Sequence, residues 1–82
     1  MKVKEVFAQA AAKLFDVTPE KVEEHFRTTG LSALPEFEAE MPVEKQAEIE
    51  TMDLERFRLV LTAIFDAVGV SMNKIEKTIK KG

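Results

Sequence analysis

The chain contains no cysteine, tryptophan or tyrosine, and only one of its 82 residues is a histidine. Without cysteine there can be no disulfide, no thiolate metal site and no cysteine nucleophile. Only three glycines are present, and they do not form a glycine-rich phosphate loop. These absences remove many of the residue types on which small enzymes and metal sites depend.

Long apolar runs are also missing. No stretch approaches the ~20 apolar residues that a membrane-spanning helix needs. The start of the chain, residues 1–4, is basic, but the apolar segment of a secretion signal does not follow it. We therefore expect a cytoplasmic protein that does not insert into membranes.

The remaining polar residues do not form a catalytic set. His25 would have to act with Ser32 or Ser71, and neither serine lies in a nucleophile-elbow or oxyanion motif. The alternating glutamates of residues 36–40 do not match a calcium loop, which needs Asp or Asn ligands and a central glycine. We predict a protein that is not an enzyme and holds no cofactor or metal, with His25 beside Phe26 at the edge of the core.

Two short segments share a pattern that ends one helix and begins another. In Val17-Thr18-Pro19, and again in Val70-Ser71-Met72, a valine precedes a hydroxyl residue that can accept a hydrogen bond from the first turn of a new helix. Apolar residues recur at helical spacing on both sides of each segment. The sequence therefore predicts an all-α fold in a single domain: a compact bundle of four to five helices built from two helix-turn-helix hairpins, 3–29 and 53–81, with an acidic helical connector over 30–52.

Within the connector, residues 30–35 read as a loop and residues 37–41 as a short helical stretch. Pro42 should end that stretch, because the residue before a proline avoids the α region. Residues 42–51 are predicted to form a helix with Val43, Ala47 and Ile49 facing inward. A mobile acidic segment over 36–50 is the alternative.

The segment 54–68 is the most apolar part of the chain, with ten apolar residues among fifteen. It is predicted to be a central helix capped by Asp53. If it is peripheral instead, Leu59 and Ala63 on its far side mark a dimer contact. The residues predicted to form the core are Phe7, Leu14, Val22, Phe26, Phe57, Leu61, Ile64, Phe65, Val68 and Ile75.

Charge is segregated along the chain. Residues 16–53 carry eleven acidic against three basic side chains, a balance of −8, whereas residues 72–82 carry four lysines against one glutamate, a balance of +3. Such segregation favours an oriented partner. The candidate contacts for a basic partner are Glu36, Glu38, Glu40, Glu44 and Glu48.

Residues 65–79 resemble the helix-turn-helix motif of bacterial repressors. The matching features are Gly69-Val70-Ser71 at the turn and the aliphatic Ile75 and Ile79 in the helix that follows. The resemblance implies that this second helix enters the major groove of DNA. It departs from the motif at Phe65, where a small residue is usual, and at Glu76, which would face the negatively charged groove.

The residues that the resemblance would bring to DNA, or that could bind an acidic partner, are Asn73, Lys74, Lys77, Lys80 and Lys81. The first two would reach base edges and the three later lysines would reach phosphates. We predict a non-enzymatic helical module that binds a protein partner or forms a homodimer. Weak DNA binding through helix 72–81 is the alternative.

Overall fold

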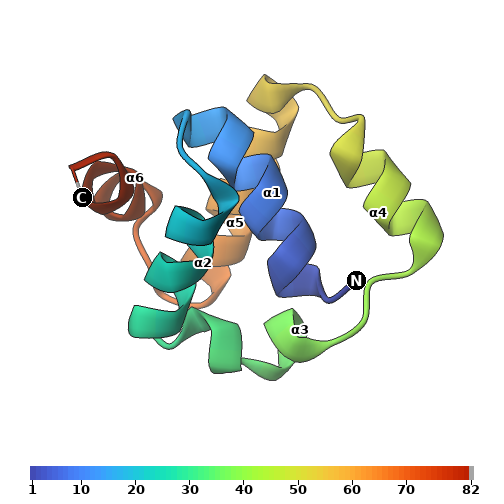
Figure 1. The fold of residues 1–82 in the computed structure, drawn as a ribbon, viewed down its shortest axis with the longest axis horizontal. Helices are drawn as coiled ribbons and strands as arrows, with labels where there is room; N and C mark the ends of the chain where they lie inside the picture. The colour runs from blue at the N-terminus through green and yellow to red at the C-terminus, as the bar shows by residue number, and fades with distance from the viewer. Residues whose placement is uncertain (82) are drawn as a thin grey trace.

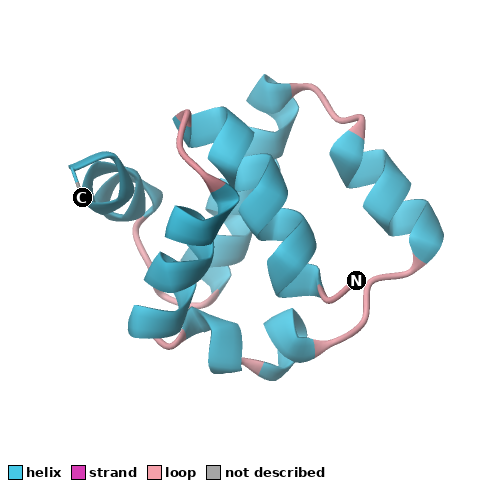
Figure 2. Cartoon of the chain, viewed as in Figure 1, coloured by secondary structure: helices cyan, strands magenta, loops and turns pink. Residues whose placement is uncertain are grey.

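The computed structural model describes residues 1–81, and every regular element among them is helical (Figures 1 and 2). The radius of gyration is 11.6 Å, which matches the ~12 Å expected of a compact chain of this length. The prediction of a compact all-α fold is confirmed. In chain order the elements are α1 (Val3–Phe15), α2 (Pro19–Thr28), the 3-10 turn η1 (Leu31–Ala33), α3 (Pro35–Glu38), α4 (Val43–Glu50), α5 (Leu54–Ala67) and α6 (Met72–Lys81).

These residues form six α-helices where four to five were expected. The difference arises in the connector. The short stretch predicted over 37–41 is instead the separate helix α3, which begins at Pro35 because the fixed φ of proline suits the first position of a helix, and which ends at Glu38 because Ala39 is extended. Residues 31–33, predicted as loop, form the 3-10 turn η1.

Both predicted capping residues start a helix as expected. The amide of Lys21 donates to the hydroxyl of Thr18 at 3.3 Å, and the amide of Lys74 donates to the hydroxyl of Ser71 at 3.4 Å. Asp53 occupies the same position before α5, but its carboxylate accepts no backbone hydrogen bond. The prediction that Asp53 caps α5 through its side chain is wrong; Asp53 is exposed, and water can satisfy the first amides of such a helix.

The central helix is α1 and not α5. The α1 helix contacts α2, α3, α4, α5 and α6, whereas α5 packs mainly against α1 and α6. In Figure 1, α1 lies in the middle of the molecule and α5 runs behind it. The reason is side-chain size, since the buried Ala8, Ala11 and Ala12 let neighbouring helices approach α1 closely. The prediction of a central helix at 54–68 is therefore wrong.

Five phenylalanines connect four helices through their rings. From α5, Phe57 lies 6.1 Å from Phe7 on α1, which lies 5.9 Å from Phe37 on α3. Phe37 in turn lies 6.1 Å from Phe26 on α2, and Phe26 lies 6.1 Å from Phe65, again on α5. The chain of rings starts and ends on the same helix, so it joins the two ends of the sequence and the connector into one core.

Most of the predicted core residues are buried, but not all. Leu14 and Ile64 are half-buried, and Val68 is 37% exposed because it lies at the end of α5. The fully buried members of the predicted set are Phe7, Val22, Phe26, Phe57, Leu61, Phe65 and Ile75.

The connector is tied to the start of α1. The amide of Val3 donates to the carbonyl of Ala39, and the amide of Met41 donates to the carbonyl of Met1, both at 2.9 Å. In α4, by contrast, Val43 is 79% exposed and Ala47 is exposed. Their predicted inward orientation is wrong, because α4 turns only its Ile49 side toward the core.

Candidate functional site

The outer side of α6 carries four of the residues singled out in the sequence. Met72, Ile75 and Ile79 are buried, which turns the opposite side of the helix to solvent. The side chain of Lys81 lies outside the described residues. The exposed members of the predicted set are Asn73, Lys74, Lys77 and Lys80.

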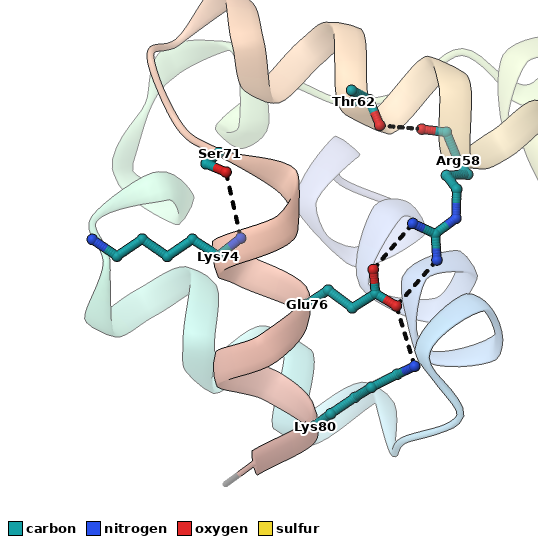
Figure 3. Close-up of polar contacts among 6 residues, drawn as sticks. All are labelled: Arg58, Thr62, Ser71, Lys74, Glu76 and Lys80. Carbon is teal, nitrogen blue, oxygen red and sulfur yellow. Dashed lines mark hydrogen bonds and ion pairs between the residues drawn. The ribbon is translucent and has the colours of Figure 1, made fainter.

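A cluster of charges joins α5 to α6 (Figure 3). The guanidinium of Arg58 donates to both carboxylate oxygens of Glu76, at 3.0 and 3.1 Å, and the ammonium of Lys80 lies 3.1 Å from the same carboxylate. The hydrogen bonds from Arg58, together with those from Lys80, hold the pKa of Glu76 below its ordinary value. Glu76 thus faces Arg58 instead of projecting from the exposed side of α6.

The salt bridge between Arg58 and Glu76 was not predicted from the sequence. Its two residues are 18 positions apart on different helices. The only available signal was the opposite charge, and the crossing of α5 and α6 decides which opposite charges meet.

Replacing Glu76 with glutamine should lower the free energy of unfolding by about 0.5–1 kcal/mol at pH 7. The loss is small because the Arg58 side chain remains 41% exposed and its charge is screened by water. The pKa of Glu76 is lowered on folding, so its contribution is present above the ordinary value of 4.5 and disappears as pH falls through the folded-state value. Urea denaturation at pH 7 and pH 3 measures this. If the free energies of unfolding of the wild type and Glu76→Gln differed equally at both pH values, the prediction would be contradicted.

The glutamates predicted to meet a basic partner lie on the connector, and three of them already have basic neighbours. Glu48 lies 3.7 Å from the ammonium of Lys45. Glu38 pairs with Lys2 at 3.0 Å and also with Lys4, and the hydrogen bonds from these lysines lower its pKa. Glu40 lies 3.4 Å from the amino group of Met1. All five are exposed, namely Glu36, Glu38, Glu40, Glu44 and Glu48. The local charge that a basic partner would meet is therefore smaller than the composition indicates.

The outer side of α5 is apolar and uncovered. Leu59 is 71% exposed, and Ala63, one turn further along the helix, is exposed as well. Ala67 extends the stripe and the half-buried Val60 borders it. We call the surface formed by Leu59, Val60, Ala63 and Ala67 the α5 face. This face is uncovered because α5 is peripheral. The sequence predicts a dimer contact at Leu59 and Ala63 for a peripheral helix.

No protein-family model, curated protein or solved structure matches the chain. Its function has to be argued from its own surfaces. None of the helices in residues 1–81 is both long enough and apolar enough to span a bilayer. Over the same residues, no three His, Asp or Glu side chains gather in a way that could hold a metal ion.

His25 borders a hollow of about 380 Å³ between α2 and the start of α6, which is also lined by Ser71, Lys74 and Thr78. The Nε2 atom of His25 is buried and has no hydrogen-bond partner among the described residues. Burial lowers the pKa of His25, because the charged ring loses contact with water. Its place next to the buried Phe26 matches the expectation of a histidine at the edge of the core.

Proposed function

We propose that this chain is a non-enzymatic binding module that contacts a protein partner, or a second copy of itself, through the α5 face. The observation that carries the proposal is the exposure of Leu59, at 71%, on a helix whose opposite side is buried in the core. The cytoplasmic location and the single-domain organisation expected from the sequence are part of the same proposal.

Burial of the α5 face supplies the driving force. Covering a leucine side chain completely is worth about 1.5–3 kcal/mol relative to leaving it in water. The side chain of Ala63 is only a methyl group, so a partner helix can approach the backbone of α5 closely. Leu59 would then be the anchor, and the small residues around it would provide the fit.

Leu59→Asp tests the proposal, with Val43→Asp as the matched control. Val43 is 79% exposed on α4 and lies one turn from the exposed Ala47, so it offers a comparable exposed apolar pair at an unrelated place. We expect Leu59→Asp to lose association, measured by light scattering and by capture of partners from native lysate, and Val43→Asp to keep it. A wild-type chain that is strictly monomeric and captures nothing would overturn the proposal.

DNA binding through α6 is the second candidate. The observation that favours it is the position of Glu76, which is held by Arg58 and Lys80, while Lys74 and Lys77 are exposed. The turn between α5 and α6 is four residues long, and α6 is viewed end-on in Figure 1 whereas α5 runs from the top of the picture toward the bottom, behind α1. A steep crossing after a short turn is typical of helix-turn-helix proteins.

A gel shift with duplex DNA at low and moderate salt tests the second candidate. Binding of this kind depends on release of counterions, so any shift should weaken as salt rises. Lys77→Ala should weaken DNA binding relative to the wild type at the same salt concentration. It should also reduce the slope of log affinity against log salt concentration by about one unit. Absence of a shift at low salt would exclude DNA binding by α6.

A further inference from the structure

We propose that the occupant of the α5 face is a second copy of the chain, bound through its own α5 in antiparallel orientation. The inference rests on the proposed function and specifies its partner. It depends on a regular spacing on the exposed side of α5, where Arg56, Leu59, Ala63 and Asp66 follow one another at intervals of three, four and three residues. That is the spacing of the residues that meet along the seam of two packed helices.

A two-fold axis between Leu59 and Ala63 pairs every one of these residues with a suitable neighbour. Leu59 meets Ala63 of the second copy, a large side chain against a small one, and this happens twice. Arg56 meets Asp66 of the second copy, also twice. Val60 of each copy lies close to the axis and closes the apolar centre.

Charge selects this orientation over the parallel one. Parallel helices would place Arg56 against Arg56 and Asp66 against Asp66, and like charges repel. The antiparallel pairing converts both repulsions into attractions. Both side chains are exposed, and neither takes part in an ion pair with a side chain of residues 1–80.

The interface is small. A helix of 14 residues is about 21 Å long, and the two ion pairs of the dimer would lie about 15 Å apart along it. Stable dimers usually bury more surface than two such helices provide. The proposed dimer is therefore weak, with a dissociation constant in the micromolar range, and association depends on protein concentration.

Reversing one charge at a time tests the orientation. Arg56→Asp places four acidic groups on the seam and Asp66→Arg places four basic groups there. We expect each variant alone to dimerise about tenfold or more weakly than the wild type. Mixed in equal amounts, the two variants should form a heterodimer, and the double variant Arg56→Asp/Asp66→Arg should dimerise like the wild type.

Sedimentation equilibrium across a range of concentrations up to about 1 mM provides the readout, with circular dichroism to show that each variant is folded. Arg27→Asp, the same change of charge at an exposed position of α2, is the matched control and should dimerise normally. Dimerisation of Arg56→Asp at wild-type strength would overturn the antiparallel pairing. A wild type that stays monomeric would overturn the proposal that a second copy occupies the α5 face. If that monomer still captured a partner in a Leu59-dependent way, the proposed function would stand without this inference.

Discussion

Replacing Phe37 with alanine should lower the free energy of unfolding by about 3–5 kcal/mol, a large part of the about 5–10 kcal/mol by which a domain of this length is stable. Phe37 lies in the four-residue α3, yet only 2% of its surface is exposed. Its ring contacts Phe7 edge-on at 5.9 Å and stacks on Phe26 at 6.1 Å. The alanine variant loses both contacts and leaves a cavity between α1, α2 and α3.

Urea denaturation followed by circular dichroism measures the effect. Val43→Ala is the matched control, because it also truncates an apolar side chain in the acidic connector but at a position that is 79% exposed. We expect that control to stay within about 0.5 kcal/mol of the wild type. Equal losses for the two variants would mean that Phe37 does not hold the connector to the core.

Replacing Ala11 with leucine should destabilise the fold by about 1–3 kcal/mol. Ala11 has no exposed surface and lies on α1, the helix that five others contact. A close-packed interior has no space for three additional carbon atoms, so either the side chain adopts a strained rotamer or a neighbouring helix moves away. The melting temperature should fall by roughly 4–8 °C for each kcal/mol lost.

Gln9→Leu is the control for Ala11→Leu. It adds a leucine to the same helix on the exposed side, where no neighbour has to move. Thermal unfolding of the two variants should therefore differ clearly. Equal melting temperatures would show that the space around Ala11 is larger than its complete burial indicates.

Local features of the fold were predictable from the sequence. The bounds of α1 and α2 follow from apolar spacing and from Thr18-Pro19, and the start of α6 follows from Ser71. Each of these signals acts within one turn of helix, so neighbouring residues are sufficient to read it. The all-α class follows from the sum of such signals.

The order in which helices pack was not predictable in the same way. The number of apolar residues favoured α5 as the centre, but α1 takes that place because its alanines allow close approach. Helical periodicity shows which side of a helix is apolar and does not show what will cover it. The predicted inward orientation of Val43 is wrong for this reason, since a helix that packs only at its Ile49 end leaves Val43 in water.

The candidate site shows the same division. The outward orientation of Lys74, Lys77 and Leu59 followed from helical spacing on α6 and α5. The pairing of Glu76 with Arg58 did not, because it depends on how two helices cross. Whether the predicted contacts bind anything stays a prediction until the variants are measured.

The path of phenylalanine rings that begins and ends on α5 has a consequence for how the chain can be divided. Phe7 and Phe26 from the first third of the sequence rest on Phe57 and Phe65 from the last third, with Phe37 between them. A fragment ending at Gly30 would keep Phe7 and Phe26 of these five rings, and the fragment that begins there would keep the other three. Each fragment would expose to water rings that are buried in the whole chain. We expect two such fragments to be unfolded when made separately and to regain helical structure when combined.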